Sequence, residues 1–193
     1  LAKSIAILPQ NPTAPEGLTV RELVSYGRAP YKTSFFSRTT AKDREMIDWA
    51  LTETNMMEFQ HRPIGAMSGG QRQRAWIAMA IAQDTEILFL DEPTSFLDVA
   101  HQMEVLRLVQ HLNEAYGKTI IMVLHELNQA ARFAHCLVGM CRGQLLYCGT
   151  PEEVFHKEML HRVFHIDAEL MSDPRTGKPM CIPYCVNESE HSA

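Results

Sequence analysis

The sequence has no excess of basic residues and no apolar run long enough to cross a membrane. It carries 18 Lys and Arg against 23 Asp and Glu, a formal net charge of -5. The electrostatic footprint that binds nucleic acid is therefore not predicted. The longest apolar runs, such as TIIMVL at 119–124, fall well short of the roughly 20 residues of a membrane span. We expect neither a transmembrane helix nor a signal peptide.

Paired cysteine motifs are also missing. The five cysteines are odd in number and show no CxxC spacing, which predicts reduced thiols in a cytosol rather than a disulfide framework or a thiolate metal site. The 193 residues are 46% hydrophobic and 21% charged, as in an ordinary globular protein. This length allows one substantial core, or one core with a smaller subdomain.

The order of elements favours an α/β fold. An apolar strand, SIAILPQ at 4–10, opens the sequence without a preceding turn, so we expect the chain to begin within a fold. A mainly helical section follows at 18–66, including a helix that starts at Thr40 with Asp43 three residues later. Strands and helices then alternate, with strands expected at 86–90, 118–124 and 136–141 and helices at 99–115 and 126–134. Continuous apolar strands in such an alternation predict a parallel sheet covered on both faces.

The last third of the sequence predicts hairpins and short helices in place of the alternating strands and helices. A hairpin is expected to turn at Arg142-Gly143, and Thr150-Pro151 to begin a short helix. DPRTGKP at 173–179 is typical of a turn between two short strands, and the polar residues 187–193 are expected to be disordered.

The stretch ILFLDEPTSFLD, 87–98, runs an apolar strand into the adjacent carboxylates Asp91 and Glu92. Such a pair suits a metal ion and an attacking water, which calls for a phosphate-binding loop. The pattern G-x-x-x-x-G-K-[ST] is matched only in part, by LNEAYGKT at 112–119, where Leu112 replaces the first glycine. That segment runs from helix to strand, the reverse of a phosphate loop. We expect a helix C-cap there instead.

A third segment, MSGGQRQRAWIAMAIAQ at 67–83, combines a capping box of Ser68 and Gln71 with two glycines. Exposed N–H groups at such a helix start bind anions. The segment resembles the signature sequence of ATP-binding cassette (ABC) transporter ATPases. ILFLDEPTSFLD is similar to the family's Walker B strand and D-loop, His125 in MVLHE to its switch histidine, and PQ at 9–10 to its Q-loop. The order of these motifs over residues 5–125 makes the resemblance specific.

Finer features also carry the resemblance. YGRAPY at 26–31 is similar to the branch that serves iron-chelate, haem or cobalamin importers. Met67 replaces the usual leucine, and Phe96 stands at a variable position. The family's Walker A loop and adenine-stacking aromatic would precede the Q-loop and have no counterpart in these 193 residues. The resemblance therefore implies that the chain by itself is inactive and leaves apolar sheet faces uncovered, so that it associates or dissolves poorly.

The resemblance implies a role for each motif residue. Asp91 would hold Mg²⁺, with Gln10 sensing the metal and the water; Glu92 would act as the base and His125 would contact the γ-phosphate of ATP. Ser68, Gly69, Gly70 and Gln71 would act in trans on the nucleotide of a second subunit, and Asp98 would lie at the dimer seam.

The implied fold is a RecA-like P-loop NTPase core, incomplete, with a parallel sheet, flanking helices and an ABC-type helical subdomain. Four parts are expected. Residues 1–17 would end the first core segment with the Q-loop, and 18–83 would form the helical subdomain. Residues 84–149 would form the core with Walker B, D-loop and switch histidine, and 150–193 the C-terminal helices, short strands and tail.

The implied function is the ATP-hydrolysing subunit of an importer of iron-siderophore-type chelates. Its partners would be a second nucleotide-binding subunit, an integral membrane permease met by residues 26–60, and indirectly a periplasmic or surface substrate-binding protein. It would be peripheral on the cytoplasmic face of the cell membrane, without nucleic acid.

Alternatives remain. The chain could be a truncated, inactive module that only binds a permease or another partner. A DNA-repair-type ABC ATPase is disfavoured, because it would carry a long heptad insertion and a basic face. A metal site of His156, His161 and His165 is disfavoured because no H-E-x-x-H pattern accompanies them.

Overall fold

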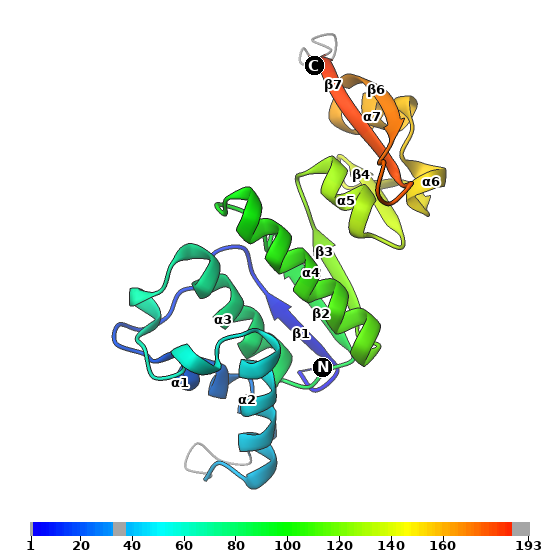
Figure 1. Cartoon of the computed structure of the whole chain (residues 1–193). Helices are drawn as coiled ribbons and strands as arrows, with labels where there is room; N and C mark the ends of the chain where they lie inside the picture. Colours follow the sequence, from blue (N-terminus) through cyan, green and yellow to red (C-terminus); the bar gives the residue numbers. More distant parts are fainter. Residues whose placement is uncertain (1, 33–37, 187–193) are drawn as a thin grey trace. The chain divides into compact units, whose positions relative to one another are not determined.

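The computed structural model describes residues 2–32 and 38–186, in two compact units, Leu1–Val123 and Leu124–Ala193 (Figure 1). The expectations for residues 33–37, within the 26–60 segment, and for the tail 187–193 lie outside the described residues. The four-part division expected from the sequence has one part, 84–149, that spans the boundary between these units, and it stays a prediction.

A three-stranded parallel sheet forms the centre of the first unit. Its strands are β1 (Ile5–Leu8), β2 (Ile87–Asp91) and β3 (Thr119–Val123), in the order β1-β2-β3. The register aligns Ile7 with Phe89, and Phe89 with Ile121. The predicted parallel sheet with flanking helices is therefore confirmed.

Local capping signals start the helices of this unit. The helices are α1 (Val20–Tyr26), α2 (Ala41–Glu53), α3 (Gly69–Ala82) and α4 (Val99–Tyr116), with short 3-10 turns η1 (Ala29–Tyr31), η2 (Met57–Phe59) and η3 (Ile64–Ala66). Capping boxes form at Thr19, Thr40 and Ser68. Those at Thr40 and Ser68 were the helix starts predicted from the sequence, since each cap bonds within three residues.

One face of the sheet carries the core of the first unit. Its buried side chains pack with those of α3 and α4: Ala6, Leu8, Leu88 and Leu90 from the strands, Ala75, Ile77, Ala78 and Ile81 from α3, and Val105, Val109 and Leu112 from α4. Alternate strand residues point the other way. On that second face Ile7 is 64%, Ile121 45% and Val123 53% exposed.

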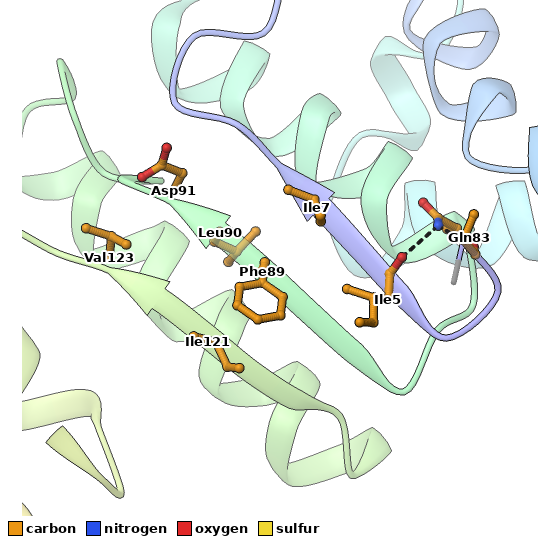
Figure 2. A pocket seen from close by; sticks show the side chains of 9 residues that line it. Ile5, Ile7, Gln83, Phe89, Leu90, Asp91, Ile121 and Val123 are labelled. Carbon is orange, nitrogen blue, oxygen red and sulfur yellow. Dashed lines mark hydrogen bonds between the residues drawn. The ribbon is translucent and has the colours of Figure 1, made fainter. Parts of the chain in front are cut away.

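The prediction that both faces are covered is therefore wrong for the described residues. Ile5, Ile7, Phe89, Ile121 and Val123 line an open hollow of about 630 Å³ on the second face (Figure 2). Apolar side chains on both faces of the strands show that both faces suit burial, but they do not say what covers each face. The expected exposed apolar face is present; the association expected from it remains a prediction.

The second unit contains α5 (Leu127–Phe133), β4 (Leu137–Cys141), β5 (Gln144–Gly149), α6 (Pro151–Val154), α7 (Lys157–Phe164), β6 (Ile166–Ser172) and β7 (Pro179–Val186). It has its own small core, built from Ala131, Val154, Phe155, Met159, Leu160, Ala168 and Cys181. Among the described residues, no helix of either unit is long and apolar enough to cross a membrane.

Two antiparallel hairpins dominate the second unit. β4 pairs with β5 through a two-residue turn in which Arg142 (φ 49°) and Gly143 (φ 76°) are both left-handed, which confirms the predicted hairpin. β6 pairs with β7 around the predicted turn after Asp173. The strand expected at 136–141 is β4, whose described partner is β5; its place in the parallel alternation stays a prediction. A short turn brings the next strand back at once, which favours antiparallel pairing.

Candidate functional site

Three of the predicted site residues meet at one edge of the parallel sheet. Gln10 follows β1, Asp91 ends β2 and Glu92 comes next. Because neighbouring parallel strands present their carboxyl ends at the same edge, these residues lie close together. The Gln10 side-chain amide donates a hydrogen bond to Glu92 Oε2. Ser95 Oγ donates to the same oxygen over 2.8 Å.

The backbone conformation at Glu92 sets the direction of its side chain. Glu92 has φ 48°, a left-handed conformation that costs a residue with a side chain about 1–3 kcal/mol. Its N–H donates to the Val123 carbonyl at 3.2 Å, beside the end of β3. The chain thus turns sharply after β2 while it stays attached to the sheet. Asp91 is exposed and lies at the rim of the open face in Figure 2.

The predicted signature residues start helix α3. Ser68 Oγ accepts the Gln71 N–H at 3.3 Å, and Gln71 Oε1 accepts the Ser68 N–H at 3.1 Å. Gly69 and Gly70 occupy the first turn, where N–H groups have no acceptor within the helix. This arrangement provides donors for an anion.

His101, in the first turn of α4, lies against the first turn of α3. A Cβ on Gly70 would lie 2.3 Å from His101 Cδ2, so only glycine allows this approach. His101 Nδ1 is 2.8 Å from Asp98 Oδ1, which also accepts the His101 N–H at 2.9 Å. These contacts, first the N–H bond and then the ring, lower the pKa of Asp98. Sequence reasoning missed His101; the D-x-x-H spacing of an N-cap was its only local signal.

His125 belongs to the second unit. It follows Leu124, is exposed, and precedes Glu126, the N-cap of α5. It lies just beyond β3, as the sequence predicts. Its role beside Glu92 stays a prediction.

The Gly-Lys-Thr at 117–119 is a helix end, as predicted. Gly117 caps α4 with φ 63°, and β3 starts two residues later. Lys118 Nζ donates to the Thr85 carbonyl at 2.7 Å, and burial lowers its pKa. Thr85 and Lys118 precede β2 and β3, so Lys118 lies at the opposite end of five-residue strands from Asp91, about 15 Å away. Lys118 therefore does not serve the Asp91 edge.

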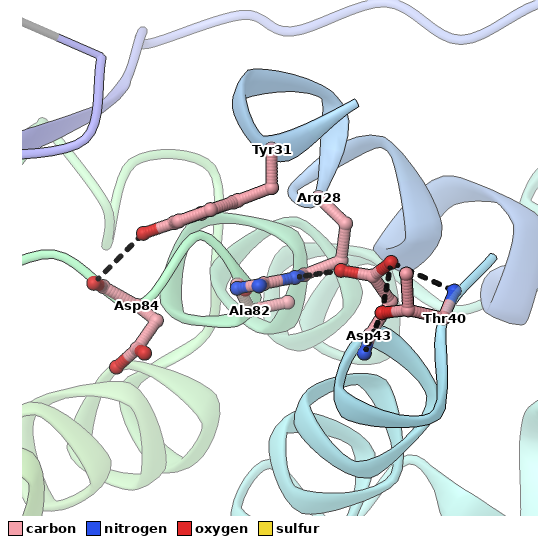
Figure 3. Close-up of polar contacts among 6 residues, drawn as sticks. All are labelled: Arg28, Tyr31, Thr40, Asp43, Ala82 and Asp84. Carbon is pink, nitrogen blue, oxygen red and sulfur yellow. Dashed lines mark hydrogen bonds and ion pairs between the residues drawn. The ribbon is translucent and has the colours of Figure 1, made fainter. Parts of the chain in front are cut away.

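One residue of the 26–60 segment, expected to meet a permease, does not lie on the surface. Tyr26 and Lys32 are exposed, as predicted for a surface that meets a partner, but Arg28 is only 2% exposed. Its Nε donates to Asp43 Oδ1 at 2.9 Å and its Nη1 to the Ala82 carbonyl at 2.8 Å (Figure 3). The Tyr31 ring covers the guanidinium, with its centroid 4.0 Å from Cζ. Arg28 is therefore not a surface charge.

Buried Asp43 completes this group, which we call the Arg28 cluster (Arg28, Tyr31, Thr40, Asp43 and the Ala82 carbonyl). Burial of the carboxyl opposes ionisation, but hydrogen bonds from Thr40 and Arg28 outweigh it and lower the pKa of Asp43. The carboxylate accepts the Thr40 N–H and hydroxyl at 2.9 and 2.7 Å. It therefore caps α2 and neutralises Arg28 together.

The three histidines considered as a metal site, His156, His161 and His165, lie at the two ends of α7. His156 Nδ1 accepts the Met159 N–H at 3.2 Å and caps α7, and His165 ends that helix with φ 55°. His161 Nδ1 lies 3.5 Å from Asp167 Oδ1. Within residues 2–32 and 38–186, no group of three or more His, Cys, Asp or Glu could hold a metal ion.

Comparison with known proteins finds relatives that are ATP-binding proteins of import systems. Residues 1–95 match the family described as ABC transporter. The chain is 55% identical over 190 residues to the iron(3+)-hydroxamate import ATP-binding protein FhuC of Bacillus subtilis, covering 98% of this chain and 70% of that protein. It is 50% identical to the petrobactin import ATP-binding protein FpuD of Bacillus anthracis (95% and 67% covered). It is 40% identical to the ferric enterobactin transport ATP-binding protein FepC of Escherichia coli (95% and 67%).

Solved structures give the same likeness. A metal-chelate type ABC transporter in an inward-facing conformation matches with a TM-score of 0.86 and 28% identity, covering 94% of this chain and 73% of that chain. CbiO1 from Clostridium perfringens, part of the ABC transporter complex cbiONQ, matches with a TM-score of 0.70 and 27% identity, covering 83% and 62%.

Proposed function

Since this chain belongs to the family of ABC transporter ATPases, we propose that it is the ATP-binding and ATP-hydrolysing part of an importer for iron-siderophore chelates. The substrate class rests on the relatives, which are import proteins for iron-hydroxamate, petrobactin and enterobactin. The observation that carries the activity is the Glu92 carboxylate, held by Gln10 and Ser95 at the carboxyl edge of the sheet.

Glu92 is proposed as the base that accepts a proton from the attacking water. A base must be held within hydrogen-bond reach of its proton donor, and two donors from different segments hold this carboxylate in place. His125, just beyond β3, is proposed to contact the γ-phosphate.

The donor set at this edge fits Mg²⁺. Asp91 offers an exposed carboxylate and Gln10 an amide oxygen, the hard oxygen ligands that this ion prefers. The described residues contain no cluster of three or more metal-binding side chains, which fits an ion held by one or two carboxylates together with substrate phosphates. When bound, Mg²⁺ would supply positive charge that neutralises the phosphates. Asp91 and Gln10 are the residues proposed to hold it.

The first turn of α3 is proposed to act on a nucleotide held by a second subunit. Ser68 and Gln71 cap each other, and the N–H groups of Gly69 and Gly70 are suited to an anion. His101 lies against this turn and is bound to Asp98, so a dimer seam here would include both. Such a site needs two copies of the chain or a paired subunit.

A membrane permease is the proposed partner, with a periplasmic or surface substrate-binding protein acting indirectly. The chain would be peripheral on the cytoplasmic face of the membrane. Exposed residues of the 26–60 segment, Tyr26 and Lys32 among them, are proposed to meet the permease.

A second candidate is a module that binds a permease or another partner without turning over ATP. It is favoured by one observation: the only G-K-T of the sequence, at 117–119, is a helix end whose lysine is bound to Thr85. Under this proposal the 193-residue polypeptide by itself is inactive.

The experiment that tests the activity is Glu92→Gln. It is made in a chimera in which a Walker A segment of the ABC family precedes this chain. The variant should bind ATP like the parent chimera but release phosphate at less than about a tenth of its rate, because the amide cannot accept the proton. Steady-state phosphate release and nucleotide titration are the measurements.

Ser95→Ala is the matched control. It removes one donor to Glu92 but leaves the carboxylate, so turnover should fall less than with Glu92→Gln. Phosphate release by Glu92→Gln at a tenth or more of the parent rate would remove Glu92 from the role of essential base.

A further inference from the structure

Two exposed thiols face each other on the β4–β5 hairpin. Cys136 Sγ and Cys148 Sγ lie 3.9 Å apart, and both residues are exposed. Cys148 pairs with Val138 across the ladder. Cys136 lies two residues before Val138, so both thiols are on the same face of the hairpin.

We propose that Cys136 and Cys148 form a thiol–disulfide site, which a small-molecule disulfide such as oxidised glutathione converts into a cross-strand disulfide. This inference does not depend on the proposed function, because it rests on the thiol geometry of the second unit alone.

The chemistry takes two exchange steps. The Cys136 thiolate attacks one sulfur of oxidised glutathione, forms a mixed disulfide and releases one glutathione thiolate. The Cys148 thiolate then attacks the Cys136 sulfur, forms the Sγ–Sγ bond and releases the second glutathione thiolate. The two thiol protons go to the released glutathiones. In sum, two protein thiols are oxidised and one oxidised glutathione becomes two reduced molecules.

The local structure allows the two sulfurs to approach. Cys136 lies in a bend before β4 and outside the paired ladder, whereas Cys148 lies within β5. Side-chain rotation and a small movement of the bend can therefore bring the sulfurs from 3.9 Å to the roughly 2.0 Å of a disulfide, without breaking the pairing of β4 and β5.

The other cysteines differ from this pair. Cys181 is in the core, and burial raises the pKa of its thiol, which makes it a poor nucleophile. Cys141 is half-buried, and Cys185 is exposed on β7. The hydrogen bond with Cys136 raises the pKa of Cys148. Because Cys136 lies in the bend outside the paired ladder whereas Cys148 lies within β5, we assign the first attack to Cys136 and the resolving step to Cys148.

A bond at this position would close the open end of the hairpin. The Arg142-Gly143 turn joins the strands at one end, and the disulfide would join them at the other, next to Thr150, which caps α6. Oxidation would therefore fix the segment that leads from β5 into α6.

The test is thiol counting on the folded 193-residue chain after treatment with oxidised glutathione. Thiols are counted in the folded chain and again after denaturation, which also exposes buried Cys181. The total number of free thiols should fall from five to three. The intact mass should fall by two hydrogens with no glutathione retained. Peptide mapping without reductant should join the Cys136 and Cys148 peptides, and reductant should restore all five thiols.

Single variants separate the steps. Cys148→Ser should stop at a mixed disulfide that retains one glutathione on Cys136, and Cys136→Ser should form no internal bond. Cys185→Ser is the matched control and should close the bond as the parent does. Circular dichroism of each variant checks that the fold is kept.

Two results would overturn the proposal. One is a parent chain that retains glutathione on both cysteines or joins other peptides. The other is a Cys136→Ser or Cys148→Ser variant that still loses two thiols within one folded chain.

Discussion

Two helices of the first unit approach neighbouring groups closely at a glycine, because a Cβ there would clash. A Cβ on Gly27, just after α1, would lie 2.1 Å from the Met79 carbonyl of α3. At Gly70 the obstacle is the His101 ring. The first obstacle is backbone and cannot move alone, whereas the second is a side chain that can rotate. Gly27 is therefore the position where a methyl group disturbs the packing of helices.

Gly27→Ala should destabilise the first unit by about 3 kcal/mol, because α1 must separate from α3 to make room. Urea denaturation followed by tryptophan fluorescence measures this, since Trp49 and Trp76 are the two tryptophans of the sequence and both lie in the first unit. Gly65→Ala is the control: nothing lies within 4 Å of its Cβ, so we expect a change below about 0.5 kcal/mol. Equal effects of the two substitutions would contradict the close approach at Gly27.

At the scale of elements, the Arg28 cluster joins three helices. Arg28 follows α1, Asp43 is in the first turn of α2, and Ala82 is the last residue of α3. The Tyr31 hydroxyl also donates to the Asp84 carbonyl at 3.4 Å (Figure 3). A buried charge whose partner is removed is strongly destabilising. The cluster therefore fixes the start of α2 relative to the end of α3.

Asp43→Asn should destabilise the first unit by about 3 kcal/mol at neutral pH, because it leaves the buried guanidinium without its counter-charge. The pKa of Asp43 is lowered in the folded chain. The ionised Asp43 carboxylate thus contributes its full stabilisation above the ordinary aspartate pKa of about 3.9. This stabilisation is lost as the pH falls through the lowered pKa of the folded chain. Urea midpoints of parent and variant should converge as the pH falls below 3.9.

Asp48→Asn is the control for this series. Its ion pair with Arg21 is half-exposed, so its loss should cost less than about 1 kcal/mol. A parent-to-variant difference at Asp43 that stays constant down to acid pH would exclude the ionised carboxylate as its source.

The surface beside the Arg28 cluster is the place to test permease contact. Lys32→Glu reverses an exposed charge in the 26–60 segment and should lower transport-coupled ATPase more than basal ATPase in the assembled importer, because it changes the proposed docking surface. Arg107→Glu makes the same charge change at an exposed residue of α4, outside the segment, and should affect neither rate by more than about twofold. Equal loss of both activities with Lys32→Glu would argue against this surface.

At the scale of the whole molecule, we predict that the 193-residue polypeptide neither binds MgATP tightly nor hydrolyses it. Asp91 and Glu92 are acceptors, and Lys118 lies at the far end of the strands. A phosphate loop would donate charge-assisted hydrogen bonds to ATP, each worth about 1.5–3 kcal/mol. Without three of them the binding free energy is weaker by about 4.5–9 kcal/mol, on the order of three to six decades in affinity.

Calorimetric titration with MgATP decides this prediction. The chimera that supplies a phosphate loop is the positive control and should bind. A dissociation constant for the polypeptide at or below about 10 μM, or roughly -7 kcal/mol, would mean that it contains a phosphate site of its own.

Local sequence by itself determined the helix starts, the turns and the order of the site residues. Thr40, Ser68 and Thr150 cap helices through partners three residues away, and such bonds need no distant partner. The family resemblance implied that Gln10, Asp91 and Glu92 share a site, and parallel strands do present their carboxyl ends at one edge.

Only the tertiary structure decided features whose partners are distant in sequence. Arg28 is buried because Ala82, 54 residues away, offers a carbonyl and Asp43 a carboxylate. Gly70 meets His101 because α3 and α4 start side by side. The sheet is open on one face although its strands carry apolar side chains on both faces. A side chain's hydrophobicity gives its preference for burial, but its burial depends on whether another element packs against it.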